Sequence, residues 1–157
     1  MSRMTREEVL QLVQKAQAAG RSPDLRNLNL SGIDLSKIDL SGALFRGSNL
    51  RRINLYKAKL RRANLSEIKL GGIDLSGTDL YQANLREAKL CGADLRDADL
   101  SWADLREANL SYAKIDKAKL EHAKFEGAKL LGVDFRNIDL SKVDLSGADK
   151  YGAIFSN

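Results

Sequence analysis

ANLRE AKLCG ADLRD ADLSW ADLRE ANL, the stretch from Ala83 to Leu110, is one five-residue repeat carried on without interruption. The frame set on Leu85 extends in steps of five from Leu25 to Phe155, which gives 27 central positions. Of these, 26 hold Leu, Ile or Phe, and Lys150 is the exception. A repeat this regular determines the fold before any other feature of the chain is considered.

A period of five fits neither a helix nor a straight strand. Five residues turn an α-helix by roughly 140°, so the central residues would wander around its surface. In a strand the side chains alternate, so successive central residues would face opposite sides. The chain must therefore bend after every repeat, turning the central residue and the small or apolar residue two before it toward one axis. Ten of the twelve glycines lie two residues after a central position, where a bend needs a permissive φ.

Continuous bending predicts an all-β solenoid, a coil whose turns stack as parallel strands about 4.8 Å apart. A chain of 157 residues is expected to form a single domain of about six coils, roughly 30 Å long. The period alone leaves the number of sides in each coil open.

The repeats resemble the pentapeptide-repeat family, whose repeat is A(D/N)LXX and which is widespread in bacteria. The resemblance covers Asp24 to about Phe155. It implies a right-handed quadrilateral parallel β-helix with four repeats in each coil. One departure is lysine in place of Asp or Asn just before the central residue, a position that faces outward, so the fold is expected to survive. The lysines are Lys59, Lys69, Lys89, Lys114, Lys119, Lys124 and Lys129.

The first 22 residues break the repeat and predict a capping helix with a linker, before a β-helix over residues 23–157. Thr5 and Glu8 form a capping box, and Val9, Leu12 and Val13 mark an apolar face. We expect this helix to lie across the open end of the first coil. Its expected contacts are Leu25, Leu28 and Leu30. A membrane-surface helix is the alternative, although the polar face carries mixed charges.

The C-terminal end has no second helix, and the repeat frays there. Lys150 falls on an interior position and Ile154 on an outward one. In one interpretation, Lys150 and the short tail blunt the strand edge. In the other, which family members suggest, the end packs on a second copy to form a homodimer through Lys150, Tyr151, Ile154 and Phe155.

A basic belt runs from Arg46 to Arg62 and contributes seven positive charges to a chain of formal net charge +5. Nucleic-acid binding is one interpretation. On a four-sided coil, however, the arginine pairs would lie on opposite sides, so solvated surface charge is favoured. The arginines are Arg46, Arg51, Arg52, Arg61 and Arg62, with Lys57 and Lys59 between them.

Residues 20 apart would stack on such a coil, which predicts three further surface features. Arg26, Arg46, Arg86 and Arg106 would form a charge ladder beside Glu67, Glu87 and Glu107. Trp102 and His122 would meet at one corner, with Tyr81 nearby, and Tyr112, Leu131 and Tyr151 would gather on the opposite side. Exposed aromatic residues on a rigid scaffold are candidate contact sites, and ordinary stacking between coils is the alternative.

No catalytic, cofactor-binding or metal-binding residues are expected. His122 has no nucleophile fixed beside it, and an unbroken period leaves no insertion that would form a pocket. Cys91 is the only cysteine, which excludes a disulfide framework and favours a reducing compartment. No apolar run approaches the ~20 residues of a membrane span, and a cytoplasmic location is expected.

The sequence therefore predicts a non-enzymatic rigid scaffold or protein–protein interaction module with an unknown protein partner. The alternative is a DNA-mimicking modulator of DNA gyrase or another type II topoisomerase, as some members of the resembling family are. Mimicry needs an acidic face, and the positive net charge and the absence of protruding loops disfavour it.

Overall fold

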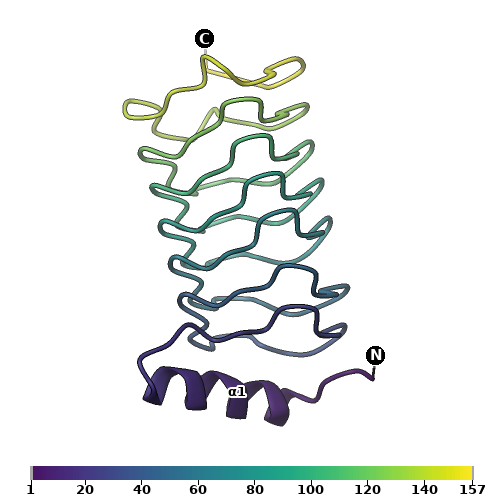
Figure 1. Cartoon of the computed structure of the whole chain (residues 1–157). Coiled ribbons are helices and arrows are strands. Elements are labelled where there is room, and N and C mark those ends of the chain that lie inside the picture. The colour runs from purple at the N-terminus through teal and green to yellow at the C-terminus, as the bar shows by residue number, and fades with distance from the viewer. Residues whose placement is uncertain (1, 157) are drawn as a thin grey trace.

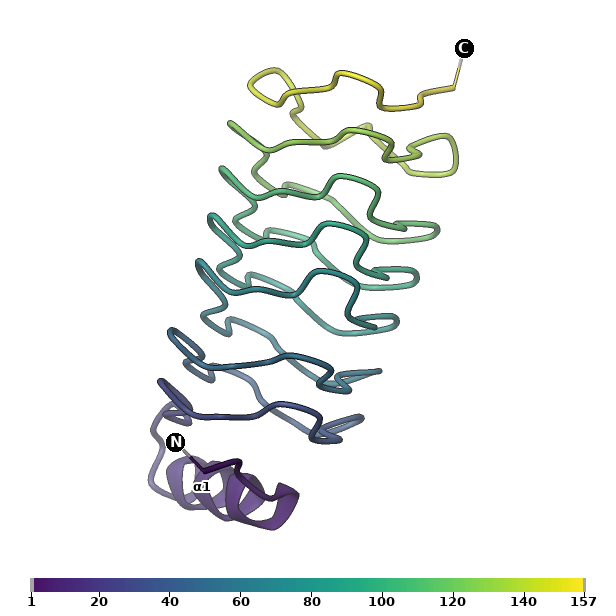
Figure 2. The same cartoon turned by 90° about the vertical axis from the view of Figure 1, so that its right-hand side faces the viewer.

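The chain forms a stack of coils with one helix at its N-terminal end (Figures 1 and 2). The structure, a computed structural model, describes residues 2–156. Within that range the single helix, α1, spans Arg6–Ala18. The described residues form no strand longer than a single bridge, and isolated parallel β-bridges join one coil to the next.

The bridges set the register of the stack at 20 residues. Asn64 pairs with Asn84, and Asn84 in turn pairs with Asp104. Because 20 residues hold four repeats, each coil has four sides. The structure therefore settles the number of sides that the period alone left open.

Every repeat bends through a hydrogen-bonded turn. In one example the amide of Ala63 donates to the carbonyl of Leu60 at 3.0 Å, and Arg62, the third residue of that turn, has a φ of 57°. The same position, two residues after the central one, has positive φ at every turn from Asn27 to Gly132. This geometry is that of a type II turn. Glycine fits it best, but 14 of the residues that adopt it are not glycine.

The residue before the central position caps this turn. The Oδ1 of Asn64 accepts a hydrogen bond from the amide of Ser66 at 3.1 Å, and each Asp or Asn at an equivalent position makes the same contact. The seven lysines at this position are exposed, as expected, and the coils continue through them. Since lysine has no acceptor, however, these repeats lack the cap.

The central residues fill the interior in four stacked columns, and all of them from Leu25 to Phe135 are buried. The two polar residues that replace alanine beside them satisfy their hydroxyl groups internally. Ser48 Oγ donates to the Leu25 carbonyl, and Thr78 Oγ1 donates to the Leu75 carbonyl at 2.6 Å. Buried polar groups are tolerated where they are paired in this way.

The helix α1 lies across the N-terminal end of the stack (Figure 1), and the predicted capping box between Thr5 and Glu8 is present. Val9 and Val13 are buried in the same apolar cluster as the first coils. Leu12, also expected to face the coil, is 38% exposed and lines a shallow hollow together with Asp24 and Leu44. Val9 and Val13 are four residues apart on one helix face, whereas Leu12 points to the side of that face.

The N-terminal segment also donates hydrogen bonds to the backbone edge of the first coil. Three carbonyls on successive sides of this coil accept them. The Met4 amide donates to the Asn29 carbonyl at 2.9 Å, and the Arg6 guanidinium donates to the Asp34 carbonyl. Gln17 Nε2 donates to the Asp39 carbonyl at 3.2 Å. Arg3 also forms a parallel bridge with Asn29, a contact that the sequence did not predict.

Two seams interrupt the hydrogen bonding between coils. Along seam A, residues 47–55 face residues 66–74, and the amides of Leu50, Arg52 and Leu55 find no acceptor within residues 2–156. Ile68 and Ile73 stand there where the next coil has alanines.

Along seam B, residues 113–125 face residues 134–144, and the amides of Ile115, Leu120 and Phe125 have no acceptor in the described part of the chain. The upper coil carries larger residues above Ala113, Ala118 and Ala123. They are Val133, Ile138 and Val143. The turns at residues 137, 142 and 147 also lack the positive φ seen in the earlier coils, so this last coil bends differently.

Candidate functional site

A hollow in the surface lies on seam B, beside the Trp102–His122 corner. It has a volume of about 560 Å³, and Trp102, His122, Phe125 and Lys142 are among its lining residues. A second, smaller hollow lies farther along the same seam and shares Lys142. The surface is therefore hollowed where the coils part, a feature that an unbroken repeat did not predict.

Trp102 and His122 stack on each other as their 20-residue spacing predicts. Their ring centroids are 4.3 Å apart with the planes tilted by 38°, and 49% of Trp102 remains exposed. Both residues hold the turn position, with φ of 63° and 58°. The turn hydrogen bonds fix this backbone, so the indole is presented from a rigid base.

Charged groups surround the stacked rings. Glu121 Oε1 is in contact with the Lys142 ammonium and lies 3.7 Å from His122 Nε2. Arg106, which also lines the hollow, is held by Asp104 at 2.6 Å. The corner thus combines an exposed aromatic surface with charges of both signs.

Within residues 2–156, His122 makes no hydrogen bond to a serine, threonine or cysteine side chain. No three His, Cys, Asp or Glu side chains converge as a metal site in the same range. An exposed tryptophan above a hollow is typical of the centre of a protein interface.

Tyr81 lies one coil below this corner, since the Gln82 amide donates to the Ser101 carbonyl at 3.0 Å, and it contacts an arginine of the basic belt. The Arg61 guanidinium lies 4.5 Å from the Tyr81 ring centroid and forms an ion pair with Asp79 at 3.0 Å. Arg62 donates to Gln82 at 2.8 Å. Both arginines of this pair thus have a side-chain partner, whereas Arg51 and Arg52 form no ion pair and no side-chain hydrogen bond within residues 2–156.

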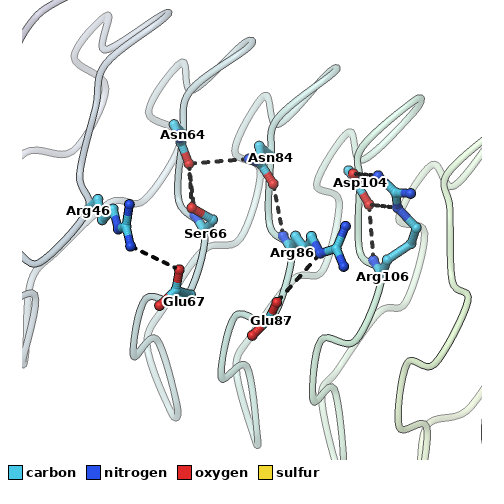
Figure 3. A network of polar contacts seen from close by, with 9 residues as sticks. All are labelled: Arg46, Asn64, Ser66, Glu67, Asn84, Arg86, Glu87, Asp104 and Arg106. Carbon is cyan, nitrogen blue, oxygen red and sulfur yellow. Dashed lines mark hydrogen bonds and ion pairs between the residues drawn. The ribbon is translucent and has the colours of Figure 1, made fainter.

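The charge ladder expected along the arginine and glutamate columns is largely wrong (Figure 3). Arg46 does reach Glu67 in the next coil, at 3.6 Å. Arg86 instead pairs with its chain neighbour Glu87, and Arg106 folds back onto Asp104. An aspartate two residues before an arginine is closer than a glutamate one coil away, so the local pair forms. Exposed pairs of this kind contribute about 0–1 kcal/mol each.

An arginine two residues after an aspartate lowers the pKa of that carboxyl group. Side-chain hydrogen bonds from Arg26 and Arg136 lower the pKa of Asp24 and Asp134 to about 2. Side-chain hydrogen bonds from Arg96 and Arg106 likewise lower the pKa of Asp94 and Asp104.

These pKa values predict how stability depends on acid. Because the folded-state pKa lies below the unfolded value of about 3.9, the stabilisation is present above pH ~4 and is lost as the pH falls toward ~2. We expect the urea midpoint to fall steeply across this window. A midpoint that stays constant between pH 4 and pH 2 would contradict the pairing. The Arg136→Gln variant should show Asp134 titrating at higher pH by NMR.

Tyr112, Leu131 and Tyr151 form an apolar strip along the corner diagonally opposite Trp102. Tyr112 is 59% exposed and Tyr151 is 82% exposed. A Cβ placed on Gly132 would lie 2.6 Å from the Tyr112 ring, so that ring lies over the glycine. Gly132 is thus required for space as well as for its φ of 70°.

Replacing Gly132 with alanine is expected to displace the Tyr112 ring and to destabilise the chain by about 1–3 kcal/mol. Gly92→Ala is the matched control, because Gly92 has a φ of 67° and its Cβ would meet nothing within 4 Å. Thermal unfolding of both variants measures the difference. Equal losses would show that φ alone accounts for the glycine.

The C-terminal end is open and partly apolar. Lys150 is exposed despite its interior position in the repeat, and Ile154 and Phe155 are 44% and 37% exposed. Phe155 stacks on Phe135 with ring centroids 5.2 Å apart. Within the described residues, no chain segment covers this last coil, whose amides at Leu140 and Leu145 have no acceptor.

The sequence missed several residues that the structure places at these surfaces. Phe125 and Lys142 line the hollow on seam B, and Lys69 lines a hollow of about 380 Å³ on seam A. The 20-residue spacing predicted the contact between Trp102 and His122. No residue pattern within a single repeat predicted where the hydrogen bonds between coils are missing. No helix within residues 2–156 combines the length and the apolar character needed to cross a membrane.

The geometry defines a class of protein, a parallel β-solenoid with four pentapeptides in each coil. The sequence model for pentapeptide repeats in eight copies matches residues 24–62, 58–97, 83–121 and 118–157. The chain therefore belongs to the pentapeptide-repeat family, whose members form right-handed quadrilateral β-helices. No curated protein sequence shows a significant match.

Solved structures share this fold. The pentapeptide repeat protein Rfr23 from the cyanobacterium Cyanothece 51142 is 22% identical, with coverage of 96% of this chain and 99% of its own and a TM-score of 0.70. The pentapeptide repeat protein alr5209 from Nostoc Pcc 7120 is 29% identical, with 99% coverage of both chains and a TM-score of 0.54. QnrB1, a plasmid-mediated fluoroquinolone resistance protein, is 23% identical over 85% of this chain and 82% of its own, with a TM-score of 0.45.

Proposed function

We propose that the chain is a non-enzymatic, rigid module that binds another protein through the Trp102–His122 corner. The observation that supports this most is the exposed indole, stacked on His122 at 4.3 Å and set beside a hollow of about 560 Å³. Tryptophan buries a large area on binding, and a side chain fixed in advance loses little entropy. A cytoplasmic location is part of the proposal.

Affinity capture from the cells of origin tests this proposal. The wild-type chain should retain at least one protein that the Trp102→Ala variant loses. Tyr112→Ala is the matched control, since Tyr112 holds the same turn position in the same coil, with a φ of 60°. A protein lost from the Tyr112 variant but kept by the Trp102 variant would move the contact to the opposite corner. Equal retention by all three chains would refute the assignment.

No feature of the structure favours the DNA-mimic alternative. One outward column contains Asp74 and Asp94 but continues with Lys114, and another contains Asp79 and Asp99 but continues with Lys119. Asp94 is also neutralised by Arg96 at 2.5 Å. A DNA mimic needs a continuous acidic face, and these columns do not provide one.

We also propose that two chains associate through their C-terminal coils. The open end is four-sided, so another four-sided end matches it best, whereas α1 occupies the N-terminal end. Contact between two like ends gives a closed twofold dimer and not a fibre. The capping role of α1 belongs to the same proposal, because it leaves one end available.

Light scattering in solution measures the mass of this assembly. We expect the wild type to be a dimer and the Tyr151→Asp, Ile154→Asp double variant to be a monomer, because the charges would be buried in the contact. Tyr56→Asp, far from the end, serves as the control and should remain a dimer. A monomeric wild type, or a double variant of unchanged mass, would contradict the proposal.

A further inference from the structure

We infer that a second surface, a basic strip formed by Arg51, Arg52, Lys69 and Lys89, binds an extended acidic segment of a protein partner. This inference rests on the proposed function, that the chain binds proteins, but it concerns a different surface from the Trp102–His122 corner. The strip lies on one side and the following corner of three successive coils. Lys69 and Lys89 pair directly in the β-bridge ladder.

The cations of the strip are not neutralised within the chain. The other arginines of the coils each have a carboxylate or amide partner, namely Arg26, Arg46, Arg61, Arg62, Arg86, Arg96, Arg106 and Arg136. Among residues 2–156, Arg51 and Arg52 form no ion pair and no side-chain hydrogen bond. Lys69 and Lys89 likewise have no acidic partner in that range. None of these four cations forms an ion pair within residues 2–156, and Glu67, the carboxylate that lines the same hollow as Arg51 and Lys69, is paired with Arg46 at 3.6 Å.

The floor between these cations lacks bulky side chains. Gly71, Gly72 and Gly92 are exposed, and a Cβ added at Gly72 or Gly92 would meet nothing within 4 Å. The surface of this corner is therefore recessed between Arg52 in the coil below and Tyr112 in the coil above. A peptide backbone can approach such a surface closely.

Seam A opens into the same strip. A hollow of about 380 Å³ has Asn49, Arg51, Ile68 and Lys69 among its lining residues. The amides of Leu50 and Arg52 have no acceptor in the described chain. Carboxylates accept hydrogen bonds from both amide and guanidinium groups, so the seam adds neutral donors to the four cations.

The width of the strip favours a narrow polyanion. Along one coil, Glu67 lies two residues before Lys69, and Asp74 lies two residues after Gly72. Acidic residues therefore border the strip on both sides and would repel a nucleic-acid duplex. A single strand usually adds stacking on aromatic side chains, and the four residues of the strip include none. An extended acidic peptide needs neither feature.

Fluorescence anisotropy with a labelled oligoglutamate peptide tests the inference on the full chain. We expect salt-sensitive binding that the Arg51→Gln, Arg52→Gln double variant weakens by about tenfold. The matched control is Arg61→Gln, Arg62→Gln, which removes the same charge from the same coil. This control should change the affinity by less than about twofold. Retained cooperative unfolding shows that each variant is folded.

Three outcomes would overturn the inference. Equal weakening by the two double variants would mean that only net charge matters. Equal or tighter binding of a labelled oligothymidylate would make the partner a nucleic acid. Absence of oligoglutamate binding by the wild type would remove the strip as a site, whereas Trp102-dependent capture would still support the proposed function.

Discussion

Leu85→Ala is expected to lower the free energy of unfolding by about 2–5 kcal/mol, one of the largest losses for a single replacement in this chain. Leu85 is fully buried in the middle of the stack. Its removal leaves a cavity between coils that the neighbouring turns prevent from collapsing. Since each coil contacts only its neighbours, the defect also weakens the coupling between the two halves of the stack. Guanidinium unfolding followed by circular dichroism measures the loss.

Leu145→Ala is the control for this prediction. Leu145 lies in the same interior column as Leu85 but is only partly buried in the last coil. We expect it to cost less than about 1.5 kcal/mol, because less apolar surface returns to water. Equal losses at the two positions would contradict the burial that the structure assigns to the column.

The second large effect is expected at the N-terminal end. Replacing Val9 and Val13 together with aspartate would place two charges against the apolar end of the first coil, where both side chains are buried. Burying unpaired charge is strongly unfavourable, so α1 should detach. The exposed strand edge would then associate with other chains. Light scattering and the yield of monodisperse protein measure this outcome.

The Leu12→Asp variant carries the matched control charge on the same helix. Leu12 is 38% exposed, so its aspartate stays in water and should leave the protein dispersed. Normal behaviour of the Val9, Val13 double variant would refute the capping role of α1. Aggregation of both variants would point to a general sensitivity of the helix and not to the buried face.

Local rules made the coil predictable. The apolar residue at every fifth position and the turn after it depend on side-chain size and backbone φ within one repeat. Leu85 and its equivalents therefore lie inside, as expected. The capping box of Thr5 and Glu8 is a contact three residues apart, and it too could be predicted.

Features that depend on several coils at once could not be predicted in this way. Seam A lies where two successive repeats carry isoleucine two residues before the central position, at Ile68 and Ile73. Ile33 and Ile38 occupy the same position in successive repeats of the first coil, and no seam opens there. Arg106 forms its ion pair with Asp104 and not with Glu107. Which carboxylate the guanidinium reaches depends on differences of a few ångströms between side-chain positions. The basic strip likewise depends on several coils, because it combines Arg51 and Arg52 of the belt with Lys69 and Lys89 from the next two coils.

Photo-crosslinking in the cells of origin, with a benzophenone amino acid at residue 102, tests whether a protein partner contacts the chain at the Trp102–His122 corner. Asp97 is the matched control, since it holds the same type of turn position in the same coil, with a φ of 57°. We predict one dominant protein adduct from position 102 and none from position 97. No adduct at 102, or the same adducts from both positions, would contradict the claim.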